Sequence, residues 1–330
     1  MANIYARSPY IIRIAQPTQL GSKLTIFLSS TTFTPLPQYT LSKLIPSPTN
    51  VNTLYDISPY IREYIRFNLC AAGGNAAVTN PTNERVNVQL KLYEYDGTVY
   101  TQVGATQTHI AFDGYTYYEE LYNKDLGNYG LDAGNYYYNP TSDAGKIRVT
   151  GGASFTAKYT SFDLIPAITS LAVSNSTFDI PRVRTANVLV GNKVEILNAA
   201  SVVQATWNFY PQDECKYTPV IIDFVNRYGA WQREFFFKAS TDNFNIESTE
   251  YNLLQTSQFP STFYSGLEGQ RKTFNANGKK SVKVNTGWVK ETWKEVLKQI
   301  MLSERILIDN KPAKINTKST ELFKQINTKQ

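Results

Sequence analysis

The stretch that says most about the architecture is Val86-Asn-Val-Gln-Leu-Lys-Leu-Tyr-Glu-Tyr-Asp-Gly-Thr-Val-Tyr-Thr-Gln-Val103. Its first seven residues alternate between an aliphatic and a polar side chain, a pattern that puts one face of a strand in a core and the other in solvent. Asp96-Gly97 follows, and this dipeptide is typical of a type I′ turn because both of its residues tolerate a positive φ. The stretch therefore predicts an antiparallel hairpin with one buried face.

Two other dipeptides, Gly191-Asn192 and Asn277-Gly278, each separate two runs of strand-forming residues. We expect a tight hairpin turn at each of them. Hairpins at this frequency favour sandwiches or barrels over a parallel α/β sheet. The expected fold class is therefore mainly β, with two antiparallel β-sandwich or barrel-like domains.

Two segments show helical periodicity instead. In the first, Ser58 can cap the helix, Pro59 suits its first turn, and apolar residues up to Ile65 form one stripe. In the second, at about 288–303, apolar side chains recur every three or four residues opposite lysines and glutamates. We expect one short helix and one longer amphipathic helix.

The chain of 330 residues is long enough for two domains. We expect an N-terminal β domain of residues 1–185, with a Tyr- and Gly-rich insertion at about 113–152. A C-terminal β domain of residues 186–330 would carry the longer helix. The boundary is expected near residue 185, because the preceding segment consists of short apolar pieces broken by Ser, Asn and Pro.

Charge and composition restrict the class of partner. Only 18% of the residues are charged, below the roughly 25% of an ordinary soluble domain, whereas 13% are aromatic. The net charge of +6 is uneven, since residues from Arg271 onward carry a balance of +9. The lysines there stand singly between apolar residues and glutamates, so we expect a solvated or protein-facing surface and disfavour nucleic-acid binding. No apolar run is long enough for a membrane helix, and we expect neither a membrane span nor a signal peptide.

Residues suited to catalysis are few. One histidine and two cysteines leave little material for metal sites, histidine-based triads or a disulfide framework. His109 lies in a strand-like context and is expected to be packed or solvated, and Cys70 and Cys215 are expected to be buried free thiols. No glycine-rich phosphate-binding loop is complete. We expect no enzymatic activity and no cofactor.

Tyrosines gather around four acids, Asp113, Glu119, Glu120 and Asp132. Tyrosine beside acids suits sugar recognition, but it also suits subunit interfaces and cores. We favour an interface or core role and keep carbohydrate binding open, while the spacing of the acids does nothing to favour glycoside hydrolysis. The candidate interface residues are Tyr115, Tyr117, Tyr118, Tyr136, Tyr137, Tyr138, Phe235, Phe237, Arg271 and Lys272.

Several phrases resemble virion proteins of tailed bacteriophages. They include Ser8-Pro-Tyr-Ile-Ile12, Gly21-Ser-Lys-Leu-Thr-Ile-Phe-Leu28, Tyr55-Asp-Ile-Ser-Pro-Tyr-Ile-Arg-Glu-Tyr-Ile65 and Cys215-Lys-Tyr-Thr-Pro-Val-Ile-Ile-Asp-Phe-Val-Asn-Arg-Tyr-Gly-Ala-Trp-Gln232. The resemblance implies a β-rich structural subunit of the tail, the tail tip or baseplate, or a collar ring. Its partners would be copies of itself in a symmetric ring and other tail proteins of the virion, assembled in the host cytoplasm. The alternatives are a tail adhesin that binds a host-surface glycan and a jelly-roll capsid subunit.

Overall fold

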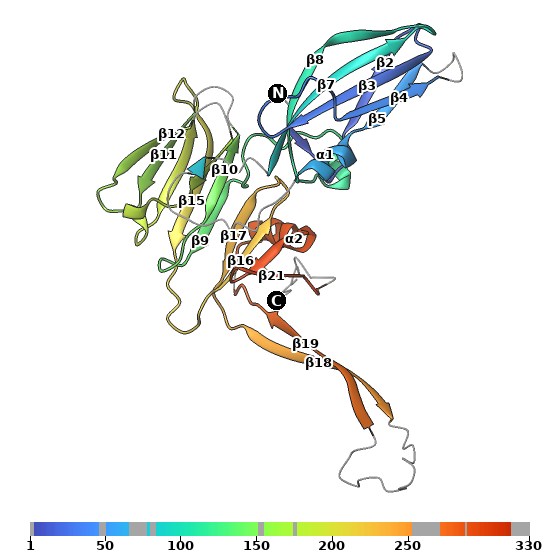
Figure 1. Ribbon diagram of the computed structural model, residues 1–330. Helices are drawn as coiled ribbons and strands as arrows, with labels where there is room; N and C mark the ends of the chain where they lie inside the picture. Colours follow the sequence, from blue (N-terminus) through green and yellow to red (C-terminus); the bar gives the residue numbers. More distant parts are fainter. Residues whose placement is uncertain are drawn as a thin grey trace, which may run out of the picture. The chain divides into compact units, whose positions relative to one another are not determined.

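The computed structural model describes residues 3–45, 51–65, 78–79, 84–150, 155–173, 177–252, 271–287 and 289–317. The protein is mainly β and sandwich-like, which confirms the expected fold class (Figure 1). The chain divides into two compact units. The larger consists of Met1–Asp213, Ile221–Phe235 and Val289–Gln330, and the smaller of Glu214–Val220 and Phe236–Trp288.

The first sheet of the larger unit has the strand order β1-β8-β7-β3-β4. These strands are β1 (Asn3–Tyr5), β8 (Tyr100–Phe112), β7 (Arg85–Tyr95), β3 (Gly21–Ser29) and β4 (Tyr39–Leu44). A two-stranded sheet of β2 (Ile11–Ala15) and β5 (Asn52–Asp56) lies beside it, and apolar residues of both sheets share one core (Figure 1). The aliphatic residues of the alternating stretch, Val86, Val88, Leu90 and Leu92, are buried in that core, which confirms the predicted hairpin.

The turn of this hairpin differs from the expected type I′ geometry. Tyr95 pairs with Tyr100, so four residues connect the strands, and of Asp96 and Gly97 only the glycine has a positive φ, 107°. The Asp96 carboxylate instead accepts hydrogen bonds from the N–H groups of Val99 and Thr98, each 2.8 Å long. These bonds lower the pKa of Asp96 to about 2. A side chain, rather than two positive φ angles, closes the loop.

A second set of strands follows in the larger unit. One sheet has the order β12 (Ile168–Val173), β11 (Phe155–Ser161), β14 (Asn192–Leu197), β15 (Val203–Pro211) and β9 (Gly134–Tyr138). A smaller sheet has the order β10 (Lys146–Thr150), β13 (Thr177–Pro181) and β6 (Val78–Thr79). The Tyr159 hydroxyl of β11 donates to the Pro181 carbonyl of β13 at 2.9 Å, so the two sheets are in contact.

This arrangement changes the expected organisation at two places. Residues 113–152 do not form an insertion on the first sheet, because β9 pairs with β15 in parallel and β10 pairs with β13. The expected boundary near residue 185 does not coincide with the observed division, since β11 and β14 on either side of it pair in one sheet. The predicted hairpin at Gly191-Asn192 is also wrong. Residues preceding it form the 3₁₀ helix η2 (Thr185–Asn187) and a turn, and β14 pairs with β11 and β15 instead.

Both predicted helices are present. The first, α1 (Ser58–Tyr64), has Pro59 in its first turn and buries Ile61 in the first core. The expected cap by the Ser58 side chain is not formed. Instead, the Asp56 carboxylate accepts a hydrogen bond from the Ser58 N–H at the start of the helix. The second, α2 (Lys294–Leu302), is preceded by the 3₁₀ helix η3 (Glu291–Trp293), so the α-helical part is shorter than expected.

A last sheet combines two strands that precede α2 in the chain with two short strands that follow it. Its order is β17 (Trp231–Phe236), β16 (Val220–Val225), β20 (Ile306–Ile308) and β21 (Lys311–Ala313). All six residues of β17 are buried, including three with charged or amide side chains. The 3₁₀ helix η1 (Tyr118–Glu120) precedes β9 and is exposed at Tyr118.

The smaller unit contains two long strands, β18 (Thr241–Asn252) and β19 (Arg271–Lys283). They pair with each other in antiparallel register over their whole length (Figure 1). The predicted turn at Asn277-Gly278 is wrong, because both residues lie inside β19, where Gly278 pairs with Ile246. The expectation of two buried thiols also fails at Cys215, which is free and exposed, whereas Cys70 lies outside the described residues.

Candidate functional site

The most exposed element of the described chain is the pair β18 and β19, here called the ribbon. Every residue of β18 is exposed, as are most residues of β19. Within the described residues these two strands form a sheet of their own, with no third strand. An isolated two-stranded ribbon is at best marginally stable in water, because it has no core to bury its side chains. The ribbon is therefore the part of the molecule that most needs a partner.

The two faces of the ribbon differ in chemistry. Side chains alternate between faces along a strand, and paired residues share a face. One face, here called the apolar face, carries Phe244, Ile246, Ala276, Gly278 and Val282, together with the ion pair of Asp242 and Lys280 at 2.6 Å. The opposite face carries only polar and charged side chains between residues 241 and 249 and their partners. Phe244 and Ile246 are 66% and 67% exposed, so the described part of the chain leaves the apolar face uncovered.

A second surface lies on the larger unit and consists of three aromatic rings, of which two belong to exposed residues and that of Tyr210 is half-buried. The rings of Phe162 and Tyr210 stack with centroids 4.9 Å apart and planes 11° from parallel, and Tyr137 lies 5.8 Å from Tyr210. We call Phe162, Tyr210 and Tyr137 the ring row. Asn208 and Asn135, two residues earlier on β15 and β9, share the face of the row and are joined by a hydrogen bond of 2.9 Å. Aromatic faces beside side-chain amides are a surface that a flat, hydroxyl-rich ligand can use.

The candidate interface residues are separated by the structure. Two of them, Arg271 and Lys272, are the first two residues of β19 in the ribbon. Tyr118 is 95% exposed and Tyr137 is 42% exposed, whereas Tyr117 is half-buried. The other five are buried within the chain itself and cannot form an interface in this conformation, which corrects the expectation for Tyr115, Tyr136, Tyr138, Phe235 and Phe237.

The buried tyrosines have internal roles that explain the correction. Tyr138 donates its hydroxyl to the Val188 carbonyl at 2.7 Å, and Tyr136 donates to the Asp132 carbonyl at 2.7 Å. The Tyr136 ring also stacks on Phe209. Because alternate residues of β9 face inward, Tyr136 and Tyr138 fill the core while Tyr137 between them faces out. The sequence shows only that three tyrosines are consecutive.

The acids that suggested carbohydrate chemistry are held by the protein's own donors. Asp132 accepts hydrogen bonds from the Tyr228 hydroxyl and from Gln299 Nε2, the latter at 2.8 Å. Glu120 accepts from Arg227 at 2.5 Å. Burial raises the pKa of Asp113, although the positive charges of nearby arginines oppose this. Glu119 is exposed. Of the four acids, two thus act as structural acceptors that tie the loop before β9 to other elements.

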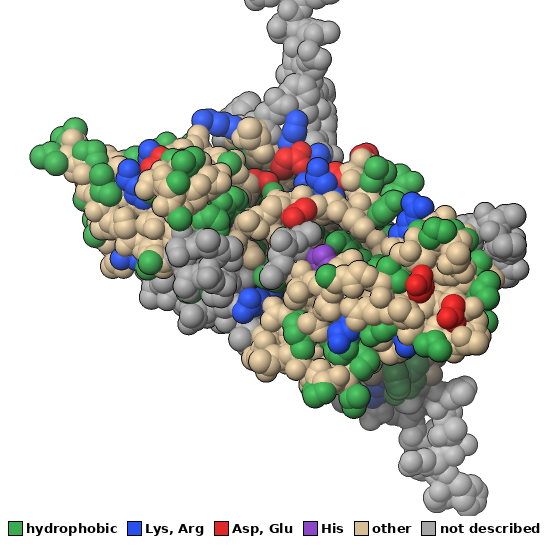
Figure 2. Space-filling model, turned by 90° about the horizontal axis from the view of Figure 1, so that it is seen from above, with side chains coloured by type: hydrophobic (Ala, Val, Ile, Leu, Met, Phe, Trp, Pro, Cys, Tyr) green, Lys and Arg blue, Asp and Glu red, His purple; other side chains and the backbone are tan. Residues whose placement is uncertain are grey.

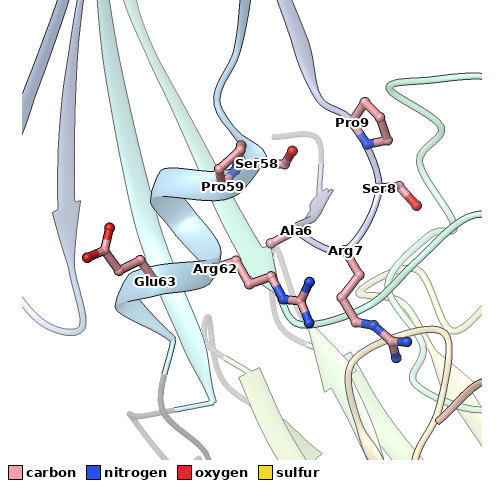
Figure 3. Close-up of a pocket in the computed structure, with 8 residues that line it drawn as sticks. All are labelled: Ala6, Arg7, Ser8, Pro9, Ser58, Pro59, Arg62 and Glu63. Atoms are coloured by element: carbon pink, nitrogen blue, oxygen red, sulfur yellow. The ribbon is translucent and has the colours of Figure 1, made fainter. Parts of the chain in front are cut away.

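A shallow pocket of about 460 Å³ lies between the start of the chain and α1 (Figure 3). Its lining residues are Ala6, Arg7, Ser8, Pro9, Ser58, Pro59, Arg62 and Glu63. In Figure 3 the guanidinium groups of Arg7 and Arg62 point to the same side, and Glu63 points away from them. Both arginines form ion pairs with Glu304, at 3.4 and 2.5 Å. The positive charge of the pocket is therefore offset by a carboxylate of the same chain.

The described residues contain neither a candidate metal cluster nor a helix that could span a membrane. No group of three or more His, Cys, Asp or Glu residues there is arranged to hold a metal ion. No helix among them has the length and apolar character needed to cross a membrane. On the face drawn in Figure 2, lysines and arginines are scattered among uncharged surface rather than gathered in one basic field.

Comparison with known proteins adds no relative. No protein-family model matches the sequence, and no curated protein is significantly similar to it.

The ribbon and the ring row were not singled out from the sequence. A signal for the ribbon was present, since Phe244 and Ile246 alternate with asparagines and the polar stretch of β19 has strand-forming residues at both ends. The dipeptide Asn277-Gly278 led instead to the prediction of a turn inside this strand, because Asn-Gly is typical of turns. The ring row carries no such signal, as Phe162 and Tyr210 lie far apart in the sequence.

Proposed function

We propose that this protein is a structural subunit of a tailed-phage virion, a component of the tail, the tail tip or baseplate, or a collar ring. It acts by binding other subunits, is assembled in the host cytoplasm and remains in the virion. The observation that carries the proposal is the ribbon, a pair of strands with an apolar face that the described part of the chain leaves uncovered. Large apolar side chains exposed on a flat strand pair favour aggregation unless a defined partner covers them.

Two other features support the proposal. The phrases that resemble phage virion proteins fall in described elements, including β3, α1 and β16. The larger unit buries ionic and amide groups in its sheets, notably Arg148, Arg233 and Glu234, each with internal partners. Such networks hold strands in a defined arrangement, which suits a subunit that presents fixed surfaces.

The test is to find the protein in the particle. Virions purified from a lysate would be analysed by quantitative peptide mass spectrometry and labelled with an antibody against this chain for electron microscopy. We expect the chain in a constant ratio to the other virion proteins, with label at the tail or the collar. Label on the head would support the capsid alternative, and absence of the chain from purified particles would refute the structural role.

The ring row favours a second candidate function, recognition of a glycan on the host surface. Sugar rings stack on exposed aromatic faces, and the amides of Asn135 and Asn208 are placed to bond hydroxyl groups. Of the tyrosines predicted from the sequence as interface residues, only Tyr137 belongs to the ring row. A glycan array is the test, with Tyr210→Ala as the disrupting change and Tyr118→Ala as a control at an exposed tyrosine outside the ring row. Saturable binding that Tyr210→Ala abolishes and Tyr118→Ala preserves is expected for an adhesin. The absence of binding would exclude it.

A further inference from the structure

The two strands of the ribbon carry opposite charges. The segment 241–252, which forms β18, contains acidic residues and no basic one, whereas the segment 271–283, which forms β19, contains basic residues and no acidic one. The acids are Asp242, Glu247 and Glu250, and the bases are Arg271, Lys272, Lys279, Lys280 and Lys283. One long edge of the ribbon therefore carries acids and the other carries bases. Asp242 pairs with Lys280 at 2.6 Å and Glu250 with Arg271 at 3.8 Å across the ribbon, which leaves Glu247 and three lysines without an ion pair of that kind among the described contacts.

Both edges are also open in the described chain. Each strand pairs with the other on one side and has no neighbour on its outer side. About half of the backbone N–H and C=O groups of such a strand point outward and can pair with a further strand. Strand addition at an open edge is a common mode of recognition between chains.

We propose that the ribbons of successive copies of this protein pair edge to edge, with β18 of one copy against β19 of the next. The proposal rests on the proposed structural function and names the partner of the ribbon, a second copy of this chain. Charge complementarity selects this order, because an acidic edge then meets a basic edge at every junction. Pairing of two β18 edges or two β19 edges would instead put like charges on neighbouring strands, which is destabilising.

The direction of the strands agrees with this order. β18 and β19 are antiparallel within one ribbon. Placing β19 beside the next β18 therefore keeps every neighbour antiparallel and every ribbon pointing the same way. The contact is head to tail, so repetition generates a ring where the rotation closes and a filament where it does not. Pairing within one sheet also puts the apolar faces, with Phe244 and Ile246, on the same side of the extended sheet.

The experiment reverses the charge of each edge in the full-length chain and measures the oligomer by mass photometry and negative-stain electron microscopy. The acid-edge variant combines Asp242→Lys, Glu247→Lys and Glu250→Lys. The base-edge variant combines Arg271→Glu, Lys272→Glu, Lys279→Glu, Lys280→Glu and Lys283→Glu. A third chain carries both sets of changes, so that its edges are again opposite in charge. A control matched to the acid-edge variant reverses three exposed acids outside the ribbon, through Glu119→Lys, Asp163→Lys and Asp213→Lys.

We expect oligomers from the wild type, the control and the doubly changed chain, and at least a tenfold loss of oligomer from each single-edge variant. Mixing the two single-edge variants should restore oligomers in which they alternate. Recovery in the mixture also shows that each variant is folded. Assembly of either single-edge variant alone at the wild-type level, no recovery on mixing, or a wild type that stays monomeric up to its solubility limit would each overturn the proposal. Those results would leave the structural function standing if the chain is found in virions, so the two failures are distinguishable.

Discussion

The ring of Phe244 lies directly over Gly278, across the two strands of the ribbon. A Cβ atom on Gly278 would stand 2.3 Å from Phe244 Cζ and 2.9 Å from Cε2, far inside van der Waals contact. Gly278 has no side chain on the apolar face, and the aromatic ring covers the strip of backbone that this leaves. Covering a strand glycine with a cross-strand aromatic ring is a recognised way to stabilise a sheet. The pair gives the ribbon a local packing contact in the absence of a core.

Replacing Gly278 with alanine should loosen the ribbon without unfolding the protein. The new methyl group displaces the ring, but the ring can rotate away, so the free energy of unfolding should change by no more than about 0.5 kcal/mol. Hydrogen exchange in peptides from β18 and β19 should become faster. Asn277→Ala, one position away on the polar face, is the matched control. Equal exchange rates in the two variants would show that the ring does not protect the ribbon.

Two glycines with the same positive φ should differ sharply in tolerance to alanine. Gly229 and Gly104 both have φ near 70°, which costs an L-residue about 1–2 kcal/mol. A Cβ on Gly229 would also lie 2.8 Å from Phe112 Cβ and 2.9 Å from Asp113 N, whereas Gly104 has open space. Gly229→Ala should therefore lower the free energy of unfolding by about 1–3 kcal/mol more than Gly104→Ala does. Urea denaturation of both variants measures the difference, and similar losses would disprove the close approach.

The buried ion pair of Arg148 and Glu84 should be costly to break from one side. Glu84 also accepts a hydrogen bond from Trp231 Nε1 at 3.1 Å, and Arg148 donates to the Gly229 carbonyl at 2.8 Å. Arg148→Met leaves a buried carboxylate without its cation, and we expect a loss of about 3–5 kcal/mol in the free energy of unfolding.

Two further variants check this interpretation of the Arg148 change. Adding Glu84→Gln to Arg148→Met should recover part of the loss, since the more deeply buried of the two carboxylates that pair with Arg148 is then uncharged, while Asp179 still lacks its cation. Lys298→Met, which removes a partly exposed ion pair with Glu295, should cost less than about 0.5 kcal/mol. A double variant as unstable as the sum of its single variants would contradict the coupling.

Glu120 should contribute to stability in a pH-dependent way. Burial opposes its charged form, but hydrogen bonds from Arg227 and from the Tyr117 N–H outweigh burial and lower the pKa of Glu120 below 4.5. A carboxyl group of this kind stabilises the fold above its unfolded pKa and loses that contribution as pH falls through its folded pKa. The free energy of unfolding should therefore fall less steeply in acid for Glu120→Gln than for the wild type.

The same substitution should cost roughly 1–2 kcal/mol at neutral pH, because a charged hydrogen bond becomes a neutral one. Glu119→Gln, at the exposed neighbouring acid, is the matched control. Denaturant titrations between neutral pH and pH 3 provide the comparison. If the free energy of unfolding falls equally steeply in acid for Glu120→Gln and the wild type, Glu120 does not contribute to the pH dependence of stability.

Local patterns predicted the individual elements well. The alternation from Val86 to Leu92 identified a half-buried strand, and helical spacing identified α1 and α2, although α2 is shorter than expected. These features depend on contacts between near neighbours in the chain, so their signal is contained in short windows of sequence. The charge segregation between residues 241–252 and 271–283 is likewise present in the sequence, although its meaning is not.

Pairings between distant segments could not be obtained in that way. Asn277-Gly278 could either turn the chain or continue a strand. It continues a strand because β18, about thirty residues earlier, pairs with it, with Ile246 opposite Gly278. Tyr136, Tyr137 and Tyr138 are chemically identical, and their burial was settled when β9 joined the edge of β15 in parallel. Composition and hydrophobic periodicity indicate which segments form strands. The neighbour and the register of each strand depend instead on packing between residues that come together only when the chain folds.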